Sequence, residues 1–235
     1  MSSKERYNYF CTFTPEGKIL PIEGVIRSTE HGSSCVALHN KNMAVIIAQR
    51  TGKNDKLLNG QTKIKQIDTN LVYVYAGVTN DGMKFQHVLR DEIQLANYKY
   101  GTPLPIMHLI ESQQFNNALE IMRYGRRASG ISVILAGIDK GKISVIEMGP
   151  TGEAIPCFGS CIGSRAQSAR TILESYDGEI LDLSNEDLQA LALSAFKNAV
   201  NDPEVISNGQ FDVCTVSLTE GVKLIPGSEI EAGSM

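Results

Sequence analysis

The chain has 235 residues and a net charge of −4, with 42% hydrophobic and 20% charged residues. These values are typical of a globular protein and exclude an intrinsically disordered chain. The one dense basic cluster, Arg123, Arg126 and Arg127, is too small for a nucleic-acid interface. The N-terminus lacks a signal-peptide core, and apolar runs such as Met43 to Ala48 are too short to span a bilayer, so we expect an intracellular protein without a membrane contact.

The spacing of cysteines and histidines predicts neither disulfides nor a metal site. The number of cysteines, five, is odd, and no CxxC pair or Cys/His zinc spacing occurs. We therefore expect reduced, mostly buried thiols and no bound metal or other cofactor. The residues concerned are Cys11, Cys35, Cys157, Cys161 and Cys214, with His31, His39, His87 and His108.

The first predicted element is a short helix over residues 21–31. Pro21 suits the first turn of a helix, and apolar residues recur at i, i+3 and i+4 on one face. Gly32 is expected to stop the helix. The apolar face consists of Ile22, Val25 and Ile26.

Blocks of strands and pairs of helices follow along the chain. Alternating and β-branched segments predict strands, whereas apolar residues at helical spacing predict helices. Ser184, with Asp187 three residues later, is typical of a capping box. The predicted strands cover residues 34–38, 43–49, 64–67, 71–76, 130–138, 142–148, 154–158 and 211–218. The four predicted helices begin after a capping cluster at 79–81, after Pro105, near Ser164 and at Ser184. The apolar face of the second helix consists of Phe115, Ala118, Leu119 and Met122.

Strand blocks separated by helix pairs favour two stacked sheets with helices outside them over a doubly wound fold. We therefore predict an α+β fold, a four-layer α-β-β-α sandwich in a single domain over residues 1–235, with an extra N-terminal helix and a mobile tail at about 226–235. No zinc-protease, P-loop, dinucleotide or nucleophile-elbow motif occurs. Residues 159–164 resemble a phosphate-binding loop but lack its lysine, so we expect a tight turn between a strand and a helix there.

Several segments resemble the proteasome alpha subunits. Tyr7, TPEGKILPIEG and the HGSS that follows the predicted helix resemble the family's N-terminal signature, and TKIKQID, LVYVYAGVTND and ASGISVILAGID follow in the family's order. MRYGRRASG and IGSRAQSARTILE are most similar to the eukaryotic alpha-6 paralogue. The resemblance covers most of the chain. It implies the N-terminal nucleophile hydrolase sandwich and a noncatalytic subunit of the 20S core particle, active in ubiquitin-dependent protein degradation in cytoplasm and nucleus.

The family pattern also bears on catalysis. In the catalytic beta relatives, a threonine freed by processing is the nucleophile, and its own α-amine, an acidic residue and a lysine assist it. These positions fall at Ser33, Gln49 and Lys63. Ser33 would need cleavage after Gly32 to gain a free amine, and Gln49 lacks the negative charge that keeps a neighbouring lysine ionised. The resemblance therefore implies no catalytic residue in this chain.

The resemblance implies other roles for two groups of residues. In alpha subunits, the lysine at the position of Lys63 lines, with Gly32, an intersubunit pocket that captures the C-terminal carboxylate of activator tails; a solvated lysine beside Lys65 is the alternative. Residues 1–11 would form a gate-like tail, with Tyr7, Asn8 and Pro15 as gate residues. The chain departs from the family where Asn8, Tyr9, Pro21 and Gly24 replace the usual aspartate, arginine, glutamine and tyrosine.

The implied partners are neighbouring alpha subunits, beta-ring subunits and the C-terminal tails of the regulatory particle or other activators. Two alternatives are left open by the sequence. One is a free-standing N-terminal nucleophile hydrolase that uses Ser33 or Cys35 after processing, which retention of residues 1–32 in the mature chain would exclude. The other is a homomeric alpha-like ring without proteolytic partners, which native mass spectrometry would reveal.

Overall fold

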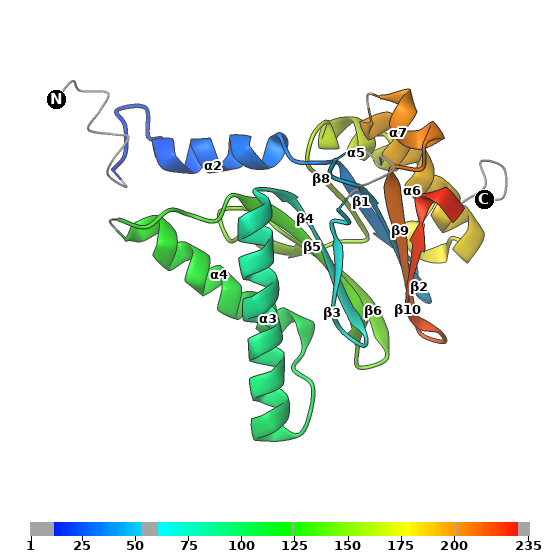
Figure 1. The fold of residues 1–235 in the computed structure, drawn as a ribbon, viewed down its shortest axis with the longest axis horizontal. Coiled ribbons are helices and arrows are strands. Elements are labelled where there is room, and N and C mark those ends of the chain that lie inside the picture. Colours follow the sequence, from blue (N-terminus) through cyan, green and yellow to red (C-terminus); the bar gives the residue numbers. More distant parts are fainter. Residues whose placement is uncertain (1–11, 53–60, 124, 201, 230–235) are drawn as a thin grey trace.

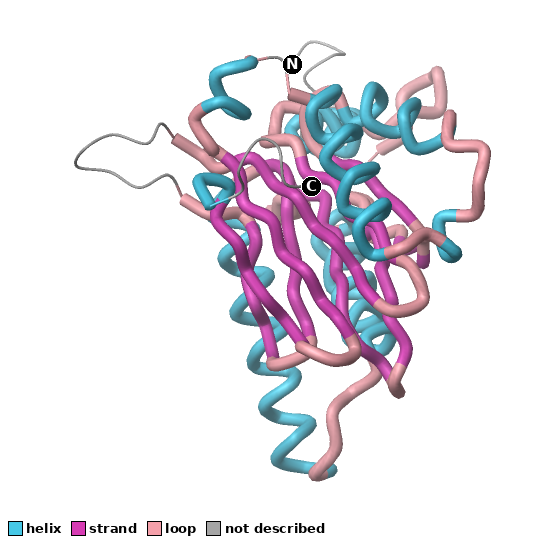
Figure 2. The backbone as a smooth tube through the Cα atoms, turned by 90° about the vertical axis from the view of Figure 1, so that its right-hand side faces the viewer, coloured by secondary structure: helices cyan, strands magenta, loops and turns pink. Residues whose placement is uncertain are grey.

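The protein folds as two stacked antiparallel β-sheets with helices on both outer faces (Figures 1 and 2). The computed structural model describes residues 12–52, 61–123, 125–200 and 202–229. The first sheet has the strand order β10-β9-β2-β1-β8, and the second has the order β3-β4-β5-β6-β7. The layers confirm the predicted α+β sandwich.

The elements have the following bounds. The strands are β1 (Cys35–His39), β2 (Met43–Gln49), β3 (Ile64–Asp68), β4 (Leu71–Gly77), β5 (Ile131–Asp139), β6 (Lys142–Met148), β7 (Ala154–Pro156), β8 (Gly159–Ile162), β9 (Phe211–Ser217) and β10 (Gly221–Pro226). The helices are α2 (Leu20–Glu30), α3 (Thr79–Tyr100), α4 (Ile106–Met122), α5 (Ala166–Glu174), α6 (Asn185–Ala199) and α7 (Pro203–Ser207), with short 3-10 turns at Ile180–Asp182 and Gly227–Glu229.

Three apolar layers hold the sandwich together. Strand residues alternate between the two faces of each sheet, so β1 and β2 send one set of side chains between the sheets and the other set outwards. The inner set, which includes Ile46, Val74 and Ile134, forms the core between the sheets. The outer set of the first sheet packs against α5 and α6, and the outer set of the second sheet packs against α3 and α4. Each sheet therefore has both faces covered.

Helix α6 follows the sequence prediction closely. The Ser184 side chain accepts a hydrogen bond from the backbone N–H of Asp187, as a capping box requires. The apolar face of the helix lies fully against the first sheet, with Leu188, Ala192, Ala195, Phe196 and Ala199 all buried.

Helix α2 has bounds one residue earlier than expected, and most of its surface is uncovered. It extends beyond the sheets above α4 (Figure 1), and its one buried residue is Thr29. Ile26 of the predicted apolar face is 36% exposed. The predicted role of Gly32 as a helix stop is wrong. A glycine that stops a helix usually has a positive φ, but the φ of Gly32 is not positive, and His31 is the C-cap of α2 in a right-handed conformation.

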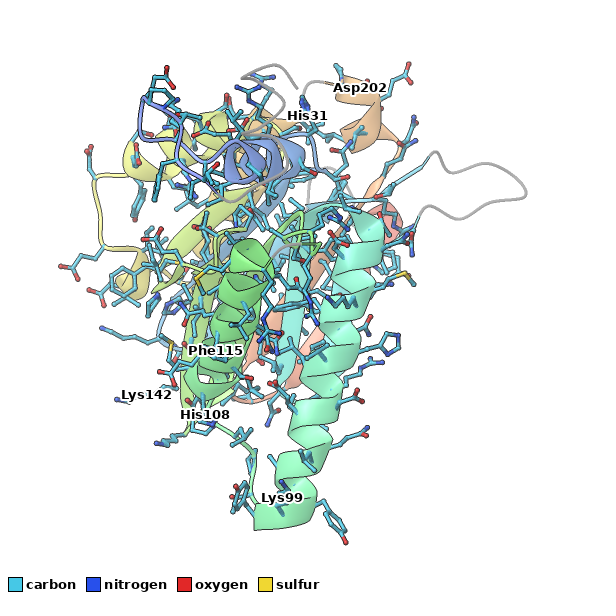
Figure 3. The ribbon with its side chains drawn as sticks, turned by 90° about the vertical axis from the view of Figure 1, so that its left-hand side faces the viewer. His31, Lys99, His108, Phe115, Lys142 and Asp202 are labelled. Atoms are coloured by element: carbon cyan, nitrogen blue, oxygen red, sulfur yellow. The ribbon has the colours of Figure 1, made fainter. Side chains whose placement is uncertain are left out.

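Three further predictions are corrected. Residues 79–81 lie inside α3, whose N-cap is Val78 and receives no side-chain cap. The segment predicted as a turn at 159–164 contains strand β8, which pairs with β1 at the edge of the first sheet. In α4, Phe115 and Met122 are 67% and 66% exposed, and Figure 3 shows Phe115 on the outer side of the helix. The buried face of α4 instead contains Ile106, Leu109, Ile110, Gln113 and Asn117.

The two predicted chain ends are only partly covered by the described residues. Residues 1–11 and 230–235 lie outside the described part, so the gate-like tail and the mobile tail stay predictions. Strand β10, which the sequence analysis did not predict, pairs with β9 and runs up to Pro226. The short turn Gly227–Glu229 follows it directly.

Candidate functional site

The positions singled out by the family pattern meet at one end of the sandwich, which we call the β1 end. Here β1 and β3 begin and β4 and β8 finish. The backbone N–H of Ser164 donates to the carbonyl of Gly32 at 2.8 Å, and that of Gln49 donates to Ser34 at 3.0 Å. The Ser34 hydroxyl donates to the carbonyl of Ser164 at 2.8 Å. Hydrogen bonds therefore fix the segment between α2 and β1 on both sides.

Glycines allow the backbones at the β1 end to approach closely. A Cβ on Gly32 would lie 2.2 Å from the backbone nitrogen of Gly77, and a Cβ on Gly77 would lie 2.1 Å from the carbonyl oxygen of Gly130. On the other side, Gly163 has a φ of +90°, and its Cβ would lie 2.2 Å from the carbonyl oxygen of Ser33. Gly32 is thus required by contact with β4 and not by a left-handed conformation.

Ser33 lies inside a continuous segment that joins α2 to β1. Two residues later, the Cys35 thiol donates to the Ser33 carbonyl at 3.5 Å and lies 3.8 Å from the Tyr75 carbonyl. Burial raises the pKa of Cys35 to about 12, so this thiol is neutral at physiological pH and is a poor nucleophile. The geometry therefore does not favour Cys35 as an activated nucleophile.

Lys63 is buried, with 4% of its surface exposed, which contradicts the alternative of a solvated lysine. Its ammonium nitrogen lies 4.5 Å from the centroid of the Tyr75 ring. Burial lowers the pKa of Lys63, and the Cys35 thiol group opposes this shift; within the described part of the chain, no carboxylate forms an ion pair with this ammonium. In the family pattern, the position of Gln49 is that of the acid that assists the lysine. The amide of Gln49 carries no negative charge.

Tyr75 is a site residue that the sequence analysis missed. Ile64 pairs with Val74 across β3 and β4, so Lys63 and Tyr75 are the next cross-strand neighbours. The sequence contains a signal for this contact, because a lysine just before one strand and an aromatic residue near the end of the next would meet in an antiparallel hairpin.

The predicted gate residues are only partly described. Tyr7 and Asn8 lie outside the described residues. Pro15 is exposed and follows Thr14 in a turn closed by a hydrogen bond from the Gly17 N–H to the Thr14 carbonyl at 2.9 Å. Proline fits the second position of such a turn because its φ is already fixed.

Within the described residues, no group of three or more His, Cys, Asp or Glu side chains is placed to hold a metal ion. Among the helices of that same part, none has the length and apolar character needed to cross a bilayer.

The two stacked sheets with helices outside them define a sandwich of the N-terminal nucleophile hydrolase type. A family model described as "Proteasome subunit" matches residues 29–216. The chain therefore belongs to the proteasome subunit family.

The relatives assign the chain to the alpha type. Proteasome subunit alpha type-1 of Caenorhabditis elegans is 28% identical over 93% of this chain and 84% of its own length. The probable proteasome subunit alpha type-6 of Schizosaccharomyces pombe is 25% identical over 89% of this chain and 76% of its own length. Alpha type-6 of Saccharomyces cerevisiae is 28% identical over 69% of each chain. The expected likeness to alpha-6 is confirmed, and it is shared with subunits named alpha type-1.

Proposed function

We propose that this chain is a noncatalytic subunit of the outer alpha ring of the 20S core particle, working in ubiquitin-dependent protein degradation in cytoplasm and nucleus. Its partners are neighbouring alpha subunits, beta-ring subunits and the C-terminal tails of activators. The observation that carries the proposal is the continuous segment from α2 through Gly32 and Ser33 into β1, in a chain with alpha-type relatives. An internal serine has no α-amine to act as a base.

Ring building is supported by the uncovered surface of α2. This helix contacts β4 and β5 near its C-terminal end, while Ile22, Val25 and Ile26 are not buried within the chain. An apolar helix face left uncovered by its own chain is suited to packing against another subunit. The gate role of Tyr7, Asn8 and Pro15 belongs to the same proposal, since α2 leads directly to the segment that contains them.

The absence of peptidase activity is testable with a hydroxyl-directed proteasome inhibitor. We expect the beta subunits of the purified particle to gain the mass of the inhibitor and this chain to keep its own mass, with residues 1–32 retained. The measurement is intact mass spectrometry of the separated subunits. An adduct on Ser33 would overturn the noncatalytic assignment and favour the alternative of a processed hydrolase.

Activator docking is the second testable role. Lys63→Met removes the ammonium and keeps a long apolar stem, so we expect an activator tail to lose at least about tenfold in affinity, as for a charge-assisted hydrogen bond. The measurement is the yield of photo-crosslinking between a tail peptide and this chain in the assembled particle. Native mass spectrometry should show unchanged ring assembly.

Lys65→Met is the matched control for this experiment. Lys65 lies on the same strand and the substitution changes the charge equally, but its register partner is Tyr73 and its side chain is partly exposed. We expect tail binding to be unchanged in this variant. Equal crosslinking yields in the Lys63→Met particle and the wild type would refute the docking role.

A further inference from the structure

The Tyr75 ring that contacts Lys63 is also packed against α3 and Tyr73. Gly82 of α3 lies against this ring, since a Cβ there would lie 2.6 to 2.8 Å from three of the ring atoms. The carbonyl of Gly82 also accepts a hydrogen bond from the Tyr73 hydroxyl at 2.9 Å. Tyr73 in turn stacks on Tyr75, with ring centroids 5.9 Å apart and an interplanar angle of 21°. The ring therefore has little freedom to leave the ammonium.

The same contact withdraws Lys63 from solvent. A cation over the face of an aromatic ring is attracted to the ring quadrupole, and this attraction is stronger where water is excluded. Lys63 is 4% exposed and Tyr75 is 1% exposed, so the contact is desolvated. A carboxylate arriving from outside the chain reaches the ammonium only if the lysine side chain moves away from the ring.

We propose that Tyr75 is a positioning residue that competes with the activator carboxylate for the Lys63 ammonium and so weakens this subunit's docking pocket. The inference rests on the docking role proposed above for Lys63. When the binding-competent conformation is a minor state, the apparent dissociation constant is the intrinsic one divided by the fraction of molecules in the competent state. Releasing Lys63 from the ring should therefore increase tail affinity.

The test compares two substitutions at Tyr75 in the assembled particle. Tyr75→Leu removes the aromatic face and should increase the affinity for a photo-reactive tail peptide by about tenfold. Tyr75→Phe keeps the aromatic face and should leave the affinity within about twofold of the wild type. Crosslinking is mapped to the β1 end of this chain, which distinguishes the pocket at Lys63 from the pockets that contain the lysines of neighbouring subunits. The same peptide with a C-terminal amide is the control for carboxylate recognition.

The outcomes separate this inference from the docking role. Loss of crosslinking with Lys63→Met together with a gain for Tyr75→Leu supports both. Loss with Lys63→Met and unchanged or weaker binding for Tyr75→Leu overturns the role of Tyr75 and leaves the docking role intact. No loss with Lys63→Met overturns the docking role itself.

A second measurement does not depend on tail binding or on the stability of the leucine variant. In the full chain, protons on the Lys63 side chain beside the nitrogen should be shifted upfield by the Tyr75 ring current. The shift should persist in Tyr75→Phe. Side-chain NMR that found these protons at the usual position of a solvated lysine in the wild type would overturn the inference.

Discussion

Gly32→Ala is expected to destabilise the isolated chain by about 3 kcal/mol or more, because the backbone of β4 leaves no space for the added methyl group. The added carbon would lie 2.2 Å from the Gly77 nitrogen and 2.8 Å from the Ala76 carbonyl carbon. Both atoms belong to the backbone of β4, which is paired on one side with β3 and on the other with β5. Neither atom can yield without disturbing the second sheet. Urea unfolding of the full chain measures the change.

Gly24→Ala is the matched control. Gly24 lies in the exposed part of α2, and a Cβ there would meet no atom within 4 Å. Alanine favours a helix interior over glycine, so this substitution should stabilise the chain by up to about 1 kcal/mol. The same chemical change is thus expected to have opposite signs at two positions eight residues apart.

Gly32→Asn distinguishes two reasons for a glycine at this position, the close contact with β4 and a left-handed helix stop. Asparagine tolerates the left-handed conformation of a helix stop, so a pure stop would accept it with little loss. Contact with β4 forbids any Cβ, so we expect Gly32→Asn to be at least as damaging as Gly32→Ala. A variant with near-native stability would show that β4 can move away and that the contact is not essential.

The regular helices and strands of this fold could be predicted from the sequence, because burial of one face makes apolar residues recur with the period of a helix or a strand. Strands β2 and β6 have the predicted bounds, and α6 has the predicted cap. In these elements the local preference and the tertiary contacts agree, so the periodic pattern is sufficient. The paired helices between strand blocks then favoured the layered sandwich.

The errors occur where tertiary contacts override the local pattern. Strand β8 contains Gly159 and Ser160, which are poor strand formers, yet pairing with the edge of β1 makes the segment extended. Phe115 suggests a core face on α4 because it is aromatic, but the buried face of α4 contains the polar Gln113 and Asn117. Sequence spacing alone does not reveal which side of a helix meets the sheet.

The candidate site was predictable in its positions but not in its contacts. The structure brings Ser33, Gln49 and Lys63, the positions that the family pattern singled out, to one end of the sandwich through the register of the strands. The orientation of the Lys63 side chain depends on Tyr75 and on the space that Gly82 leaves for its ring. That arrangement requires three elements to be placed together, which no local pattern encodes.

The buried carboxylate of Asp81 is expected to be the strongest polar determinant of stability near the β1 end. It accepts hydrogen bonds from both terminal nitrogens of Arg127 at 2.7 Å and from the Gly130 N–H at 2.8 Å. These bonds tie the first turn of α3 to the segment that enters β5. Asp81→Ala leaves a buried N–H without its acceptor and breaks a bidentate ion pair, so we expect a loss of about 3 kcal/mol in the free energy of unfolding at pH 7.

The pH dependence of the stability lost in Asp81→Ala distinguishes the contribution of the carboxylate charge from that of side-chain packing. Burial acts to raise the pKa of Asp81, but hydrogen bonds from Arg127 and Gly130 and the charge of Arg127 outweigh it, so the pKa is lowered. A carboxyl with a lowered folded-state pKa stabilises the fold above its unfolded pKa of about 3.9, and this contribution disappears as the pH falls through the folded pKa. The difference in urea midpoint between wild type and Asp81→Ala should therefore shrink below about pH 4.

The control is Asp182→Ala, which breaks an exposed pair with Lys41. It should cause no measurable change in the urea midpoint at pH 7 or below about pH 4. A difference for Asp81→Ala that is constant from pH 7 to pH 3 would show that the carboxylate acts through its shape and not through its charge.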